Sequence, residues 1–187
     1  LLYNTYGSAV NKINSSLMEG IEKGKNPRDV AKQLTDDLHA SFFAMDRIAR
    51  TEMLRAYRES QRRYYEDTGL LRGYQRLATK DHRVCLACLV NDGRFYAIDQ
   101  RFIEHPQGRC QLVPVFNDEP DLAWQFGHQW IHTISSQWQQ EIMGKDRWEL
   151  YKKGIALDTM IETVNNGIWG LGYRTIPLNE LQKRYAT

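Results

Sequence analysis

The feature that most constrains this chain is a set of three cysteines and one histidine between positions 85 and 110. Cys85 and Cys88 form a C-x₂-C pair, and His105 and Cys110 follow in the segment H-P-x-x-R-C. The sequence contains no other cysteine. Two close pairs of soft or borderline donors, joined by a loop, are the ligand pattern of a structural zinc site. The spacing therefore predicts a tetrahedral zinc centre held by Cys85, Cys88, His105 and Cys110.

The segment between the two pairs suits a connecting loop, and other uses of the cysteines remain open. Asn91-Asp92-Gly93 is a hairpin-turn signal, and the strand-like run 95–98 follows it. The thiols could instead be ordinary small buried groups, or two of them could form a disulfide and leave the third free. A catalytic thiol assisted by a histidine and Asp81 is a weaker alternative, because C-x₂-C pairs rarely serve hydrolysis and no oxyanion-type glycine motif flanks them.

The residues around the cysteines also carry a family resemblance. In chain order, the matching segments are Ala49-Arg50-Thr51-Glu52, Asp81-His82-Arg83-Val84-Cys85-Leu86-Ala87-Cys88, Asp92-Gly93, His105-Pro106-Gln107-Gly108-Arg109-Cys110 and Leu112-Val113-Pro114. Together they resemble the signature of the phage Mu protein F-like family, the minor head proteins of tailed phages. Segments 140–145 and 147–154 resemble the region that often follows this signature, so the resemblance spans about residues 20 to 181.

This resemblance implies a structural protein of the virion, located inside the head near the portal vertex. Such proteins act in head assembly and in genome packaging or ejection, with the portal and capsid proteins of the same phage as partners and packaged DNA as a further contact. The implied location is the phage head, and the host cytoplasm during assembly. One departure concerns Gly108, where many members have a cysteine; His105 must then be the fourth ligand if a metal is bound.

Composition and motifs favour a non-enzymatic protein. The 187 residues suit one domain, or one domain with an appendage, and a net charge of +2 lacks the basic excess of a dedicated nucleic-acid binder. The sequence has no P-loop, G-x-S-x-G or H-E-x-x-H motif, so neither catalysis nor a small-molecule substrate is expected. It also has no apolar run long enough to predict a membrane span. The alternative functions are a zinc-bearing module that binds or processes nucleic acid, and an effector delivered with the genome.

Hydrophobic periodicity predicts an α+β fold with a helical N-terminal half, a small antiparallel sheet carrying the Cys/His cluster, and a helical C-terminal tail. The expected helices are 1–24, 27–38, 43–68, 135–143, 146–153, 158–165 and 177–185, and the expected strands are 71–79, 94–98 and 111–116. Residues 1–118 are predicted to form the family's domain, with helices in 1–69 and the sheet in 70–118. Residues 119–187 are then a helical appendage.

Five charged residues are expected to form a structural polar cluster between helix and sheet. They are Arg50, Glu52, Asp81, Arg83 and Arg109. Charges placed beside apolar positions need partners, so we expect Arg50 or Glu52 to contact one of the other three.

Two further groups could serve as contact surfaces. Arg55, Arg58 and Arg62 recur at helical spacing and could face DNA, although neighbouring glutamates favour an ion-paired surface instead. All five tryptophans lie in the C-terminal third. Trp124 and Trp130 fall in a loop-like stretch, where they are either core residues or anchors for a partner.

Overall fold

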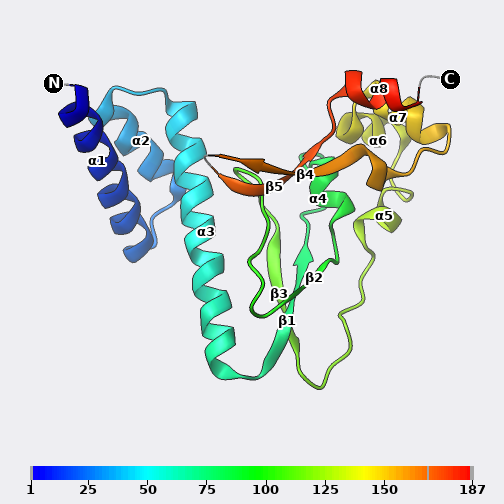
Figure 1. Ribbon diagram of the computed structural model, residues 1–187, viewed down its shortest axis with the longest axis horizontal. Helices are drawn as coiled ribbons and strands as arrows, with labels where there is room; N and C mark the ends of the chain where they lie inside the picture. Colours follow the sequence, from blue (N-terminus) through cyan, green and yellow to red (C-terminus); the bar gives the residue numbers. More distant parts are fainter. Residues whose placement is uncertain (1, 168, 186–187) are drawn as a thin grey trace. The chain divides into compact units, whose positions relative to one another are not determined.

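The computed structural model describes residues 2–167 and 169–185, and its contacts divide the chain into two compact units (Figure 1). The first unit is Leu1–Arg63 and the second is Tyr64–Thr187. This division by contacts does not test the domain boundary expected at residue 118, which stays a prediction.

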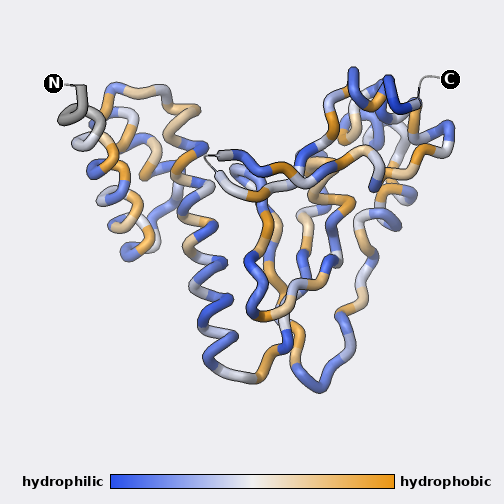
Figure 2. Tube along the Cα trace, viewed as in Figure 1, coloured by the Kyte–Doolittle hydropathy of each residue, from blue (hydrophilic) through white to orange (hydrophobic). Residues whose placement is uncertain are grey.

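Helices α1 (Leu2–Glu22), α2 (Pro27–Leu38) and the first part of α3 (Phe42–Thr68) form the N-terminal unit. The start of α2 follows from its sequence: the Asn26 side chain accepts a hydrogen bond from the backbone N–H of Arg28 at 2.9 Å, and Pro27 occupies the first helical position. Hydrophobic positions recur along these helices (Figure 2) and meet in one core. Its buried members are Leu17, Val30, Ala31, Leu34, Met45, Ala49 and Met53. The helical N-terminal half is therefore confirmed.

The second unit contains a three-stranded antiparallel sheet in the order β2-β1-β3. Its strands are β1 (Leu71–Leu77), β2 (Phe95–Ala97) and β3 (Gln111–Phe116), which confirms the three expected strands to within two residues at each end. Tyr74 pairs with Tyr96 on one side and with Pro114 on the other. Gly73 allows this close pairing, because a Cβ there would lie 2.2 Å from the carbonyl oxygen of Tyr96.

The short helix α4 (Leu86–Val90) lies between β1 and β2. The C-terminal part contains α5 (Gly127–Trp130), α6 (Ser136–Met143), α7 (Lys145–Lys152), a 3₁₀-helix at Leu157–Met160 and α8 (Leu178–Tyr185), together with a two-stranded hairpin. Strand β4 (Ile161–Asn166) pairs antiparallel with β5 (Gly170–Thr175). The helix expected at 158–165 is therefore wrong. Leu157, Met160, Ile161 and Val164 have helical spacing, but pairing with β5 satisfies the backbone of this segment instead.

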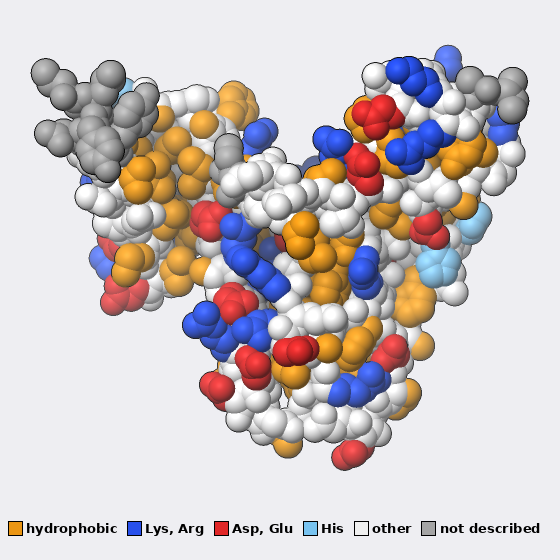
Figure 3. Space-filling view, viewed as in Figure 1, with side chains coloured by type: hydrophobic (Ala, Val, Ile, Leu, Met, Phe, Trp, Pro, Cys, Tyr) orange, Lys and Arg blue, Asp and Glu red, His pale blue; other side chains and the backbone are white. Residues whose placement is uncertain are grey.

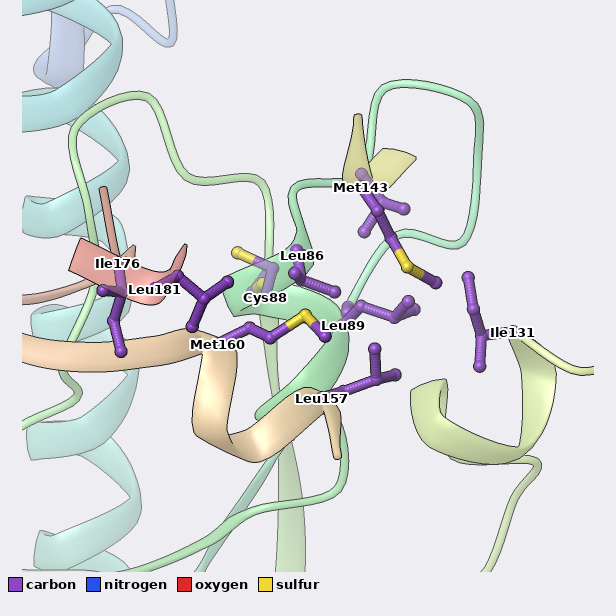
Figure 4. Packing of buried hydrophobic residues seen from close by; sticks show 12 residues of the cluster. Leu86, Cys88, Leu89, Ile131, Met143, Leu157, Met160, Ile176 and Leu181 are labelled. Atoms are coloured by element: carbon purple, nitrogen blue, oxygen red, sulfur yellow. The ribbon is translucent and has the colours of Figure 1, made fainter. Parts of the chain in front are cut away.

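One hydrophobic core joins the cysteine-bearing region to the C-terminal part. Leu86, Cys88 and Leu89 of α4 pack against buried residues from α6, the 3₁₀-helix and α8, and from the positions directly after α5 and β5 (Figure 4). The buried residues contributed from beyond position 118 are Ile131, Met143, Leu157, Met160, Ile176 and Leu181. The C-terminal segment therefore covers the face of α4 that carries Leu86, Cys88 and Leu89. Across the described helices, none combines the length and apolar character needed to cross a membrane.

Candidate metal centre

The first cysteine pair is positioned by the start of helix α4. Cys85 is the N-cap residue, and its Sγ accepts a hydrogen bond from the backbone N–H of Cys88 at 3.3 Å. A sulfur in the capping position replaces the usual oxygen acceptor and brings the Cys85 and Cys88 side chains together around the first helical turn. Cys85 is half-buried, whereas Cys88 is buried in the core.

His105 faces both sulfurs of this pair. Its Nε2 lies 3.2 Å from Sγ of Cys85 and 3.0 Å from Sγ of Cys88. Its Nδ1 lies 2.8 Å from the carbonyl oxygen of Pro106. A carbonyl can only accept, so Nδ1 carries a hydrogen and Nε2 is the nitrogen available to a metal. A backbone carbonyl commonly fixes metal-binding histidines in this way.

Cys110 belongs to a second, overlapping group of donors. Donor atoms of Cys85, Cys88 and His105 lie within 4.8 Å of one another, and so do those of Cys88, Glu104 and Cys110. Cys88 belongs to both groups. All three cysteines are free thiols in the structure, so the structure contains no disulfide between them.

These residues fit a tetrahedral metal chemically. Zinc binds thiolate sulfur at about 2.3 Å and imidazole nitrogen at about 2.0 Å, which places the sulfurs of one site about 3.8 Å apart. Within each of the two groups, the sulfurs need to approach one another by about 1 Å at most to reach this spacing. Three sulfurs and one imidazole are a common structural zinc ligand set. The four predicted ligands are divided between two groups that share Cys88, so a single site formed by all four stays a prediction. Glu104 is a neighbouring donor that the sequence pattern did not predict.

In the metal-free chain, the cysteines and His105 share protons. A hydrogen bond with Cys88, reinforced by His105, lowers the pKa of the Cys85 thiol to about 4. Burial opposes the charged form of His105, but the interaction with Cys85 dominates and raises the pKa of His105 to about 9. Hydrogen bonds with Cys110 and Cys85 raise the pKa of Cys88. A bound metal would take the place of the protons that the cluster otherwise shares.

A bidentate ion pair joins the two loops that carry the ligands. The guanidinium of Arg109 donates to both carboxylate oxygens of Asp81, at 2.6 and 2.7 Å. Arg109 precedes Cys110, and Asp81 lies four residues before Cys85, so this pair connects the two ends of the site. Arg83 contributes its backbone N–H to Asp81 at 2.9 Å, while its side chain is exposed.

The five residues of the expected polar cluster are divided between the two units. Arg50 pairs with Asp46 at 2.9 Å, and Glu52 pairs with Arg55 at 3.1 Å, all on helix α3 in the N-terminal unit. Asp81, Arg83 and Arg109 lie in the other unit. The contact of Arg50 or Glu52 with these three residues stays a prediction.

Asp92 is a second anchor of the site, which the sequence indicated only as part of a turn. Its buried carboxylate accepts from the backbone N–H of Ala78 at 2.7 Å and pairs with Lys80 at 2.7 Å. It also accepts from Nε1 of Trp124 at 3.3 Å. Asp92 therefore fixes the end of α4 to the residues after β1 and to the segment that follows the sheet.

The two groups of candidate contact residues are engaged within the chain. Arg55 pairs with Glu52, and Arg62 pairs with Glu59 at 2.9 Å. Arg58 is buried. Side chains of both charge signs lie intermingled on the visible surface (Figure 3), in keeping with the small net charge. A DNA-facing role for Arg55, Arg58 and Arg62 stays a prediction.

The two tryptophans are half-buried. The ring of Trp124 packs edge-on against Phe126, with centroids 5.4 Å apart, and Trp130 packs against Trp138 at 5.7 Å. Trp130 also contacts the core that contains Cys88. Both side chains therefore contribute to the fold, and their role as partner anchors stays a prediction.

Comparison with known proteins adds one match. A family model described as "Phage Mu protein F like protein" matches residues 11–113, which is more than half of the chain and includes all four expected metal ligands. No curated protein and no solved structure matches this chain.

Proposed function

This chain belongs to the phage Mu protein F-like family of head morphogenesis proteins, and from that membership we propose that it acts inside the phage head, near the portal vertex. There it takes part in head assembly and in packaging or ejection of the genome. Its partners are the portal and capsid proteins of the same phage. The observation that carries this proposal is the family match, because it extends from within α1 to within β3 and includes the Cys/His cluster.

Within this function, the Cys/His cluster is a structural zinc centre. Cys85, Cys88, His105 and Cys110 would hold the ion, and zinc would cross-link the start of α4 to the loop before β3. The support is the convergence of the donors in two groups that share Cys88. Such a cross-link contributes directly to folding stability. It suits a segment that has short strands and an irregular loop.

The protein has no catalytic turnover of its own in this proposal. A thiol close to an imidazole also occurs in cysteine hydrolases, and Cys85 lies 3.2 Å from His105. The support for a structural role is the partner of Nδ1 of His105, which is the carbonyl of Pro106 instead of an orienting carboxylate or amide side chain. Peptide or nucleic-acid hydrolysis that disappears in Cys85→Ser would contradict this part.

Co-assembly with the portal protein of the same phage tests the location. The full chain should associate with assembled portal at physiological salt. Trp130→Ala should weaken this association if Trp130 is an anchor. Trp138→Ala is the comparison variant, because it removes the other half of the same aromatic pair and leaves Trp130 in place. A loss of portal association in Trp130→Ala alone would indicate that Trp130 contacts the portal protein. An equal loss in both variants would indicate destabilisation of the chain.

Two results would count against the proposal. The first is failure of the wild-type chain to associate with portal or capsid protein at any salt concentration. The second is DNA affinity that falls steeply with salt, because such a slope reports the release of counterions by phosphate contacts and would favour a nucleic-acid-binding module.

A further inference from the structure

A fully buried arginine holds the loop that carries His105. Arg76 lies on β1, and its side chain is 0% exposed. Its Nη1 donates to the carbonyl oxygen of Ile103 at 3.0 Å, and its Nη2 donates to Oε1 of Glu104 at 3.0 Å. The guanidinium also lies over the ring of Phe102, 4.6 Å from its centroid. One side chain therefore contacts three successive residues of a segment that has no regular secondary structure.

Glu104 connects Arg76 to the backbone of His105. Its Oε1 accepts from the backbone N–H of His105 at 3.0 Å, in addition to the bond from Arg76. The same carboxylate is a neighbour of the Cys88 and Cys110 sulfurs. Gly108 leaves room for it, because a Cβ at that position would lie 2.1 Å from the Glu104 carboxyl carbon.

This arrangement has a specific chemical requirement for arginine. The planar guanidinium presents donors in a fixed fork, so it can bind a carbonyl and a carboxylate at once, which a lysine ammonium cannot do with the same geometry. Burying a charge is costly unless the charge is paired and hydrogen-bonded. A metal site with three thiolates beside the Glu104 carboxylate concentrates negative charge, and the Arg76 cation offsets part of it.

We propose that Arg76 and Glu104 are positioning residues which hold His105 Nε2 against the Cys85 and Cys88 sulfurs before a metal binds. The expected effect on metal affinity rests on the proposed metal centre. The contacts that Arg76 and Glu104 make with the loop are those of the metal-free chain. A site formed in advance binds metal more tightly, because less ordering of the loop is needed at the moment of binding. Partners of metal ligands typically contribute a factor of about 10 to 100 in metal affinity.

Metal affinity is the first test, measured on the full chain by competition for Zn²⁺ with a chromophoric chelator. Glu104→Gln keeps the shape of the side chain and removes its charge, whereas Arg76→Lys keeps the charge and removes the fork. Each should weaken Zn²⁺ binding by about 10- to 100-fold. Arg72→Lys is the matched control on the same strand, because the Arg72 guanidinium binds the exposed Asp121 and the carbonyl oxygen of Glu119, which lie outside the loop. The control should leave the affinity within about twofold of wild type.

Co²⁺ substitution distinguishes a positioning residue from a ligand. Thiolate-to-metal absorption bands should keep the wild-type pattern in Glu104→Gln, because the same sulfurs and nitrogen still bind the ion. A changed Co²⁺ spectrum in Glu104→Gln, with an unchanged spectrum in Arg76→Lys, would overturn the proposal by making Glu104 itself a ligand. Unchanged Zn²⁺ affinity in both variants would also overturn it.

Hydrogen exchange of the metal-free protein supplies a test that does not depend on metal. Amides of residues 102–105 should exchange at least about tenfold faster in Arg76→Lys than in wild type or Arg72→Lys. Equal exchange rates would refute the positioning role. If the wild-type chain binds no metal, the proposed zinc centre fails, while this comparison still decides whether Arg76 holds the loop. If Arg76→Lys fails to fold, the same comparison is made with Glu104→Gln.

Discussion

The Sγ atom of Cys88 lies 3.0 Å from Nε2 of His105, although 17 positions separate the two residues. Helix α4 supplies the sulfur, and an irregular loop supplies the nitrogen. Such a loop is restrained by its side chains, and here Arg76, Glu104 and the Asp81–Arg109 pair provide the restraint. Formation of the site therefore depends on the residues around the ligands as well as on the ligands themselves.

The three cysteines should differ in reactivity when no metal is bound. At pH 6, iodoacetamide should modify Cys85 first, because its pKa of about 4 makes it a thiolate and because it is the most exposed of the three. Cys88 should react last, since its pKa is raised and its side chain is buried. Peptide mapping by mass spectrometry measures the order. Fastest labelling at Cys88 would contradict this order of reactivity. Protein loaded with Zn²⁺ is the control, in which the bound metal should protect the cysteines from labelling.

Replacing Asp92 should destabilise the second unit strongly. Asp92→Ala leaves the Ala78 N–H without its acceptor and Lys80 without its buried partner. Loss of such a network costs about 2–4 kcal/mol of unfolding free energy. Urea titration followed by tryptophan fluorescence measures the change. Asp118→Ala removes an exposed carboxylate and should change stability by less than about 0.5 kcal/mol. Equal effects of the two substitutions would remove Asp92 from its anchoring role.

The sequence predicted the elements whose signals are local. The Asn26-Pro27 cap and the apolar spacing of residues 30 and 34 identify α2, and the C-x₂-C pair identifies the site. The segment 158–165 was misassigned because its apolar residues have helical spacing, while its strand partner, β5, is found only through pairing. Short helices α4 and α5 are too brief to show a periodic pattern.

The residues that complete the site could not be found from spacing. Arg76 occupies a strand in which an arginine normally faces water, and only the fold shows that both faces of β1 are covered there. Glu104 directly precedes His105, which the spacing predicts as a ligand. The role of Glu104 itself depends on Arg76, which lies 28 positions earlier in the sequence. Buried ion pairs of this kind join residues far apart in the sequence, and no local pattern specifies them.

The Asp81–Arg109 pair should make stability depend on pH in the acidic range. Hydrogen bonds from Arg109 lower the pKa of Asp81, so the folded state favours the carboxylate. The stabilisation is complete above the ordinary aspartate pKa of about 4 and is lost progressively as the pH falls from there through the lowered pKa of the folded state. Asp81→Asn should cost about 0.5–1 kcal/mol at pH 7 and less at pH 3. Urea unfolding at the two pH values, with Asp118→Asn as control, measures this. A cost that is larger at pH 3 would contradict the sign.

Packing of the C-terminal part against α4 should make the second unit unfold as one. Met160 is fully buried in the core that contains Cys88 and Leu89. Met160→Ala should cost about 2–5 kcal/mol through loss of burial and the cavity left behind. The matched control is Met18→Ala, which removes a methionine that is 70% exposed. Hydrogen exchange of α4 should accelerate in Met160→Ala. Acceleration confined to residues after 118 would show that the C-terminal part unfolds separately.

Metal analysis of the purified chain, combined with X-ray absorption, tests the zinc centre most directly. Wild-type protein should contain about one zinc per chain, with sulfur ligands at about 2.3 Å and a nitrogen ligand at about 2.0 Å. Cys88→Ser should lose the ion, because Cys88 belongs to both donor groups. Removal of zinc by a chelator should lower the thermal midpoint of the wild type but leave that of Cys88→Ser unchanged. A wild-type chain that contains no zinc and takes up none, or whose mass shows a disulfide between two of its three cysteines, would contradict the metal centre.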